Sequence, residues 1–210
     1  MRFRPGILFL LLLACSDTLL FRSSADYFPL RSGAQWKYLR NCSDTVYVQV
    51  DTSSAVLLGQ NCIRVYRNFA PEYYTLSPTE VRRLFLDIFS RPGTTEDTIA
   101  WFGLLYQLPL VLGNSYEERF DTTLIWGSDT LKYSHTLTAK VAAIVDTLTP
   151  AGTFYDCYRI EFSEKKIIDQ ETTDVKFTEL LAPETGIIAR HHPDFDEILV
   201  FYQSKPQPTQ

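Results

Sequence analysis

The densest group of side chains that could do chemistry lies in the segment 191–197, which reads His-His-Pro-Asp-Phe-Asp-Glu. Imidazoles and carboxylates are the groups that hold zinc or manganese. Neighbouring residues on a strand point to opposite faces, however, so His191 and His192 cannot enter one site without a bend. The apolar runs on either side, 187–189 and 198–201, favour the solvated turn of a β-hairpin. We therefore predict a turn and no metal ligands, and keep a metal-dependent enzyme around the two histidines as a third functional hypothesis.

Other chemical signatures are missing from the sequence. It contains no G-x-S-x-G, G-x-x-x-x-G-K-[ST] or H-E-x-x-H pattern, which removes the common hydrolase, nucleotide-binding and zinc-protease motifs. His135 lies in a polar, alternating segment and is predicted to be an exposed histidine on a strand. Glu117, Glu118 and Asp121 are typical of a solvated face and not of an acid–base pair. The sequence therefore predicts no catalytic residue, no cofactor and no enzymatic activity.

The composition is that of a globular chain. Of 210 residues, 45% are apolar, 14% aromatic and 21% charged, which excludes a disordered chain, a collagen-like repeat and a polytopic membrane protein. The 20 basic and 25 acidic side chains give a net charge of -5 without a basic cluster, so nucleic acid is not an expected partner. Abundant aromatic residues favour pleated sheet over a helix bundle.

Alternation of apolar and polar residues is the commonest local pattern, as in 46–50, 61–67 and 154–162. Turn-forming residues interrupt the apolar runs at short intervals, at 51–54, 127–129, 150–152 and 193–196. Strands separated by short turns pair in antiparallel fashion, and no helix recurs between them. We predict a mainly β protein with a single antiparallel β domain, built as a curved sheet, a half-barrel or a sandwich, with at most one or two short helices.

The segment 78–89 fits two structures. Ser77-Pro78-Thr79-Glu80 has the form of a helix capping box, and apolar residues follow at helical spacing. The same apolar residues also alternate, and a Ser-Pro pair can open a hairpin turn. We favour a strand and leave the helix open.

The apolar stretch 101–112 is too rich for a strand with one solvated face. It must be covered on both sides, and we favour the central core strand of a sandwich. The alternative is a pocket for an apolar ligand, lined by Trp101, Phe102, Leu105 and Leu108.

An internal repeat is the most specific feature of the chain. Pro29-Leu30-x-x-Gly33-x-x-Trp36 recurs, 80 residues later, as Pro109-Leu110-x-x-Gly113-x-x-Tyr116. The proline ends strand pairing, the leucine enters the core, the glycine takes the turn and the aromatic residue begins a strand. We expect the two copies to be structurally equivalent and each to start a meander.

The N-terminal segment has the features of a signal peptide, which we assign to residues 1–14. Arg2 and Arg4 precede the apolar run 7–13, which is far shorter than the roughly 20 residues of a membrane-spanning helix. Its end, Leu-Leu-Ala-Cys, resembles the lipobox of bacterial lipoproteins, which implies cleavage before Cys15, lipid attachment to its thiol and a place in the cell envelope. Ser16 after the cysteine resembles the signal for the outer membrane.

We divide the rest of the chain into a lipidated tether (15–26), a β-rich domain (27–203) and a disordered tail (204–210). If Cys15 carries lipid, three cysteines remain, so at most one disulfide forms within the chain. A Cys42–Cys62 bridge and a Cys62–Cys157 bridge are both open.

The repeated Pro-Leu-x-x-Gly-x-x-Trp/Tyr motif, the segment Thr149-Pro150-Ala151-Gly152-Thr153-Phe154-x-x-Cys157 and the later Ala182-Pro183-x-x-Gly186 resemble a broad group of uncharacterised bacterial lipoproteins. The resemblance implies a mostly antiparallel β domain, similar to the half-barrel of the periplasmic lipoprotein carriers. It implies no shared chemistry. The functional expectation is a membrane-anchored, non-catalytic module for a protein partner or a structural contact, and the alternative is a carrier or sensor of an apolar, lipid-like ligand.

Overall fold

The computed structural model describes residues 26–90, 96–126 and 129–204. Within these ranges the chain forms twelve β-strands and no helix, which confirms the prediction of a mainly β domain. None of the described residues belongs to a helix that is long and apolar enough to cross a membrane. The strands are β1 (Gln35–Arg40), β2 (Asp44–Leu57), β3 (Gln60–Arg67), β4 (Ala70–Leu76), β5 (Glu80–Phe89), β6 (Asp97–Gln107), β7 (Ser115–Trp126), β8 (Asp129–Thr149), β9 (Gly152–Ile168), β10 (Glu171–Ala182), β11 (Gly186–His192) and β12 (Phe195–Gln203).

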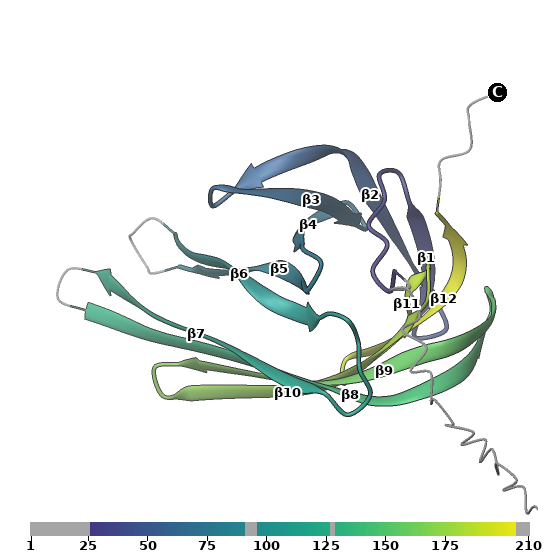
Figure 1. Cartoon of the computed structure of the whole chain (residues 1–210). Helices are drawn as coiled ribbons and strands as arrows, with labels where there is room; N and C mark the ends of the chain where they lie inside the picture. The colour runs from purple at the N-terminus through teal and green to yellow at the C-terminus, as the bar shows by residue number, and fades with distance from the viewer. Residues whose placement is uncertain (1–25, 91–95, 127–128, 205–210) are drawn as a thin grey trace, which may run out of the picture.

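All twelve strands belong to one antiparallel sheet, in the order β6-β5-β4-β3-β2-β1-β12-β11-β10-β9-β8-β7. Each strand pairs with its neighbours in sequence, except that β1 pairs with β12 and that β6 and β7 are the two edges. The sheet is so strongly curved that it is nearly closed into a barrel (Figure 1). The first and last strands of the chain thus pair with each other. The gap in the barrel lies between β6 and β7, which are consecutive in the middle of the chain.

The segment 78–89 is strand β5 preceded by a turn, so the favoured prediction of a strand is confirmed. The Ser77 hydroxyl accepts hydrogen bonds from the backbone N–H groups of Thr79 (3.3 Å) and Glu80 (3.0 Å). The backbone N–H of Ser77 donates to the carbonyl of Glu80 at 2.9 Å. The Ser-Pro pair thus opens a hairpin turn and does not cap a helix.

The turn predicted at 51–54 is wrong, because these residues lie inside β2. The β2–β3 register shifts between Val50 and Ser54, and the Asp51 carboxylate accepts hydrogen bonds from the backbone (3.3 Å) and hydroxyl (3.0 Å) of Ser53. A β-bulge accommodates the turn-forming side chains while the strand continues. The turns predicted at 150–152 and 193–196 do join strands, β8 to β9 and β11 to β12.

The two copies of the sequence repeat make the same backbone hydrogen bonds. The N–H of Gly33 donates to Val50 (3.1 Å) and that of Gly113 donates to Val141 (2.9 Å). Val50 and Val141 in turn donate to the residue after each glycine, in both cases at 2.9 Å. Both glycines have positive φ, +77° and +88°, which glycine adopts without strain. The copies are structurally equivalent, and each begins a six-stranded meander, β1–β6 and β7–β12.

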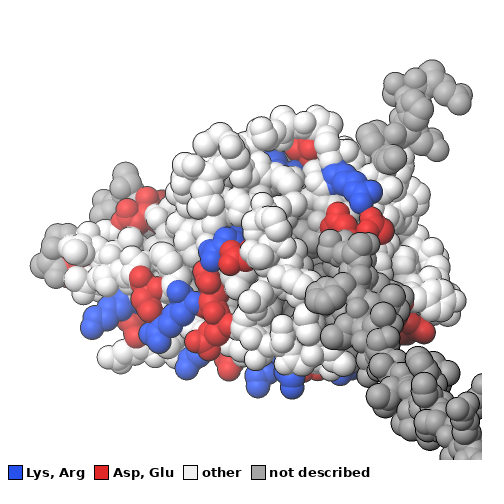
Figure 2. Space-filling model, viewed as in Figure 1, with Lys and Arg blue, Asp and Glu red and all other residues white. Residues whose placement is uncertain are grey.

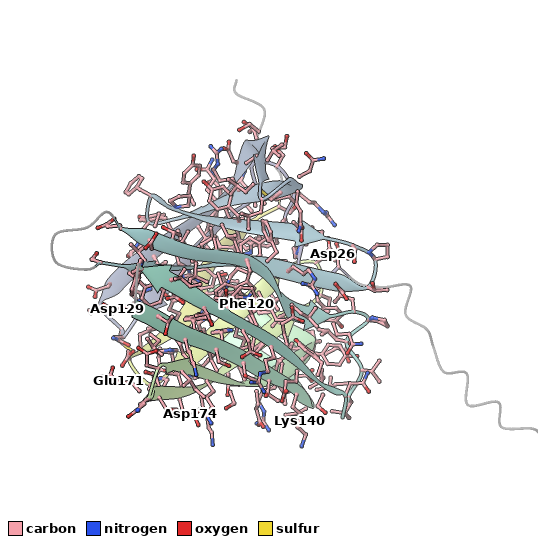
Figure 3. All side chains as sticks on the ribbon, turned by 90° about the vertical axis from the view of Figure 1, so that its left-hand side faces the viewer. Asp26, Phe120, Asp129, Lys140, Glu171 and Asp174 are labelled. Carbon is pink, nitrogen blue, oxygen red and sulfur yellow. The ribbon has the colours of Figure 1, made fainter. Side chains whose placement is uncertain are left out.

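Side chains close the seam between β6 and β7, where the described residues form no backbone ladder. The Trp101 and Phe120 rings stack at 4.4 Å, and the Tyr116 hydroxyl donates to the carbonyl of Leu105 at 2.5 Å. In Figure 3 Phe120 lies near the middle of the molecule, whereas Lys140 and Asp174 lie toward its periphery.

Strand β6 is buried on both faces, as expected, although the prediction of a central strand is wrong because β6 is an edge of the sheet. Consecutive residues along it are at most 8% exposed, namely Trp101, Phe102, Leu104, Leu105 and Tyr106. An edge strand is therefore buried on both faces here, and the Phe120 ring of β7 covers Trp101.

The hairpin of β8 and β9 is longer than its neighbours. Pairing with β7 ends at Lys140, and pairing with β10 ends at Tyr158, so residues 142–157 pair only with each other. Two register shifts, at 141–143 and 145–147, bend this extension, and the N–H of Ala151 donates to the carbonyl of Leu199 at 3.3 Å. The tip of the hairpin thus curves back to β12, at the right of Figure 1.

Leu58 and Gly59 form the two-residue turn between β2 and β3, with φ values of +49° and +73°. Positive φ at both positions defines a type I′ turn, in which Asn-Gly is preferred and leucine is strained. We expect Leu58→Asn to raise the free energy of unfolding by about 0.5–1 kcal/mol in chemical denaturation. Leu86→Asn, at a similarly exposed position within β5, should give no increase, and an equal gain in both variants would contradict the turn argument.

Candidate functional site

The interior contains a cavity of about 40 Å³ between the first strands, β11 and the residues that precede β1. Such a volume admits a few water molecules and no larger ligand. Its walls combine apolar rings with three charged side chains and are formed by Phe28, Pro29, Leu30, Trp36, Tyr38, Val48, Val65, Arg67, Glu72, Tyr74, Gly186, Ile187 and Arg190.

The first described residues seal one side of this cavity. The Phe28 ring lies 5.3 Å from that of Tyr74 and 5.2 Å from that of Tyr106. Asp26 and Glu184 exchange two hydrogen bonds, from the Asp26 N–H to the Glu184 carboxylate (3.0 Å) and from the Glu184 N–H to the Asp26 carbonyl (2.8 Å). Arg31 pairs with the same carboxylate at 2.6 Å. The segment 26–30 is therefore part of the folded domain.

A buried carboxylate, Glu197, is the centre of the largest polar cluster. Its side chain is 1% exposed and is bound by Arg40 at 2.7 Å and by Arg67 at 2.9 Å. Burial alone would raise the pKa of Glu197, but the guanidinium groups of Arg67, Arg40 and Arg190 outweigh it, so the pKa lies below its ordinary value. Glu197 is therefore ionised at neutral pH and ties β12 to β1 and β3.

A second buried carboxylate, Glu179 on β10, is held in the same way. Arg190 binds it at 2.6 Å, and the Tyr106 hydroxyl donates a hydrogen bond to its other oxygen. Burial and the neighbouring Glu179 raise the pKa of Tyr106 well above its usual value, so the phenol stays protonated. Both buried carboxylates are thus engaged by arginine, as a stable buried charge requires.

His135 forms a further polar cluster, and the prediction that it is exposed is wrong. Its side chain is 2% exposed, and its Nε2 lies 2.9 Å from the Glu164 carboxylate. The Phe85 and Trp101 rings cover the imidazole, at centroid distances of 4.8 and 5.1 Å. Alternation alone does not show which face of this strand is buried, and the imidazole faces the interior, where Glu164 is its partner.

Next to this cluster, Asp87 of β5 joins the two halves of the sheet. Lys166 of β9 binds one oxygen at 2.7 Å and the Tyr133 hydroxyl donates to the other at 2.5 Å. These contacts cross the interior, because β5 and the pair β8 and β9 belong to opposite halves of the chain.

The histidines at 191 and 192 lie where the hairpin turn was predicted. His191 is exposed and its Nδ1 is 2.9 Å from Asp196, whereas the His192 ring stacks on Phe195 at 4.7 Å. They follow each other at the end of β11 and do not converge. Among the described residues, no group of three or more His, Cys, Asp or Glu side chains is placed to hold a metal ion.

Neither predicted disulfide is present, and Cys42, Cys62 and Cys157 are free thiols. Cys42 lies in the turn before β2, whereas Cys62 pairs with Ala55 near the other end of β2, roughly 30 Å along the strand. Cys157 is on β9, and five other strands lie between β9 and β3 in the sheet. Burial raises the pKa of both inner thiols, that of Cys157 to about 11, so neither is a reactive thiolate.

The four residues of the predicted apolar pocket lie on β6 and in the residue that comes just after it. Trp101 is stacked between Phe85 (5.2 Å) and Phe120 (4.4 Å), and Leu105 is in the core. Phe102 is buried and Leu108 is half-buried. None of the four lines the cavity described above, and a ligand pocket here stays a prediction.

Cys15, the predicted lipid attachment site, lies outside the described residues, so its acylation stays a prediction as well. The charged cluster around Glu197 and Glu179 was not anticipated. One sequence signal could have revealed the cluster: an acidic residue two positions from a buried apolar residue points to the same face of the strand. Glu197 has this relation to Leu199, and Glu179 to Leu181.

No protein-family model matches the chain, and no curated protein matches it significantly. Two solved structures match it: a predicted lipoprotein of Parabacteroides distasonis ATCC 8503 (12% identity, TM-score 0.46) and a predicted exported protein of Bacteroides fragilis NCTC 9343 with a YmcC-like fold (11% identity, TM-score 0.47). Each comparison covers 84% of this chain and 98% of the other. They define neither a family nor a function for this chain.

Removal of the Glu197 charge should leave Arg67 and Arg40 without their buried partner. We expect Glu197→Gln to lower the free energy of unfolding by about 3 kcal/mol, measured by chemical denaturation. The matched control is Glu161→Gln, which removes an exposed carboxylate 3.5 Å from Arg159 and should change it by less than about 0.5 kcal/mol. Equal effects of the two substitutions would show that the buried cluster does not stabilise the fold.

The same carboxylate makes stability depend on acid. The pKa of Glu197 is depressed in the folded state, so its contribution is complete above the unfolded-state value of about 4.3 and is lost as the pH falls below it. We expect the free energy of unfolding to fall less steeply with decreasing pH in Glu197→Gln than in the unaltered protein. The measurement runs from about pH 6 to about pH 3, which brackets the unfolded-state pKa of about 4.3. Parallel curves would contradict the assignment.

Proposed function

We propose that this chain is a lipoprotein of the bacterial cell envelope, anchored through Cys15, whose β domain acts as a non-catalytic module for a protein partner or a structural contact. The observation that supports a non-catalytic interaction module is the filled interior of the domain. Trp101 lies between two rings, Glu179 and Glu197 are bound by arginines, and the cavity beside Trp36 and Tyr38 measures about 40 Å³. A domain filled in this way offers its outer surface for function.

The anchor is supported by the sequence alone. A short basic start, an apolar run and Leu-Leu-Ala before Cys15 fit the lipobox pattern. Two or three acyl chains hold a protein on a membrane, whereas one chain binds only marginally. Ser16 favours the outer membrane over the inner one.

A carrier or sensor of an apolar ligand is the alternative, and it requires a pocket of several hundred cubic ångströms. Two wider hollows, of about 360 and 390 Å³, are open depressions of the surface, one by Trp126 and Leu131 and the other by Val145 and Leu180. Neither is lined by the stretch 101–112, so the interaction module is the better supported role.

Replacement of the anchor cysteine tests the proposal. In the native host, Cys15→Ala should move the protein from the membrane to the soluble envelope fraction, and mass spectrometry of the unaltered protein should show acyl mass on residue 15. The domain should keep its circular dichroism spectrum, because the substitution lies outside the described fold. Cys42→Ala, which alters an exposed thiol, is the control and should stay on the membrane. Unmodified Cys15 in membrane-free extract would refute the proposal.

A further inference from the structure

The extended β8–β9 hairpin carries exposed apolar side chains on one of its two faces. Ile144 is 45% exposed, Leu148 74% and Tyr155 64%, and we call these three residues the hairpin patch. They share one face because exposed and covered residues alternate along both strands of the hairpin. The opposite face packs inward: Val145 and Phe154 contact the core, and Cys157 is fully buried. The patch is therefore a surface without a partner within the described chain.

The chain enters the domain next to this hairpin. Asp26 is the first described residue, and the Tyr27 ring meets that of Tyr158 at 5.0 Å. The Tyr27 hydroxyl also donates to the carbonyl of Asp156 at 3.4 Å. Only residues 16–25 separate Asp26 from Cys15. Even a fully extended chain from Cys15 to Asp26 reaches at most about 40 Å, so an anchor at Cys15 keeps the hairpin within reach of the lipid surface.

We propose that the hairpin patch rests on the lipid surface to which Cys15 is anchored. Ile144 and Leu148 enter the boundary between headgroups and acyl chains, and Tyr155 lies at headgroup level, where an amphipathic ring is favoured. This inference rests on the proposed lipid anchor and deepens it, since it specifies which side of the domain faces the membrane.

The chemistry of the hairpin selects the lipid hydrocarbon boundary and not anionic headgroups. Exposed Asp146 lies between Ile144 and Leu148 along β8, and its carboxylate accepts a hydrogen bond from the Asp156 N–H at 3.1 Å. The visible surface at the right-hand end of the molecule is otherwise mostly uncharged (Figure 2). The whole chain is acidic, with a net charge of -5. Attraction to anionic lipids requires basic clusters, which are missing here. The contact should therefore be independent of salt and of anionic lipid.

Three side chains alone bind a lipid surface weakly, and attachment through Cys15 keeps them close enough to the surface to stay bound. Linking a weak site to an anchored chain raises its effective concentration to the millimolar range or above. The contact is therefore expected only in the lipidated protein, not in a soluble domain added to vesicles.

Other exposed apolar residues serve as controls. Ile125 is 72% exposed near the end of β7. This strand begins opposite Lys140, at the base of the hairpin, and runs away from the hairpin. The exposed fraction of Ile125 matches that of Leu148, but Ile125 has no place in the proposed contact.

The experiment uses the lipidated full-length protein with Cys42→Ser, which leaves only the buried thiols of Cys62 and Cys157. An environment-sensitive nitrobenzoxadiazole label is attached to Leu148→Cys or to Ile125→Cys, and each protein is incorporated into phosphatidylcholine vesicles. We expect the label at 148 to brighten several-fold and to be quenched by nitroxide-bearing lipid, at low and high salt alike. The label at 125 should do neither.

Equal responses of the two labels in protein that is bound to the vesicles would overturn the inference and leave the anchor intact. A response at 148 that depends on protein concentration in detergent without vesicles would also overturn it, because a second copy would then cover the patch. Protein without acyl mass that fails to float with the vesicles would refute the anchor itself. A second test uses an unlabelled protein that carries both Leu148→Asp and Tyr155→Asp. In the unaltered protein, vesicles should slow hydrogen exchange at residues 144–155, and this protection should be lost in the double variant. Its near-UV circular dichroism should be unchanged, which shows that the fold is intact.

Discussion

The pairing of β1 with β12 depends on a buried carboxylate that both sides of the junction share. Glu197 belongs to β12, and the arginines that bind it belong to β1 and β3. A buried charge is stable only when opposite charges surround it, so the position of Glu197 fixes where these three strands lie relative to one another. Hydrogen bonds between the two strands then complete a junction between segments about 160 residues apart in sequence.

The two halves of the chain meet in two different ways. At one junction β1 and β12 form a regular ladder, and at the other β6 and β7 are held by Trp101 against Phe120 and by Tyr116 against the backbone of Leu105. Each half begins with the same turn, so the difference arises from the later strands of each meander and not from its start. Side chains therefore hold the second junction, whereas backbone hydrogen bonds hold the first.

Sequence patterns within a few residues correctly predicted the structural features that depend on neighbouring residues. The strand at 80–89, the turn after His192 and the equivalence of the two glycine turns depend on residues close in sequence. The partners of His135 and Glu197 lie 29 residues away and more than 100 residues away respectively, and no local pattern reveals them. The bulge at 51–54 was missed for a related reason: turn-forming side chains satisfy the backbone equally well in a bulge, and only pairing with β3 decides between the two. Lipidation of Cys15 lies outside the described residues.

The attachment of the segment 26–30 decides how the domain would respond to mechanical load. The Phe28 ring contacts two tyrosine rings, and the Glu184 carboxylate accepts a hydrogen bond from the backbone N–H of Asp26. The next strand, β1, is hydrogen-bonded on both sides, so it cannot peel away as a free edge would. Tension applied at Asp26 must dislodge the buried Phe28 ring and then shear the two ladders of β1. Pulling at this terminus therefore loads a strand that is paired on both of its edges.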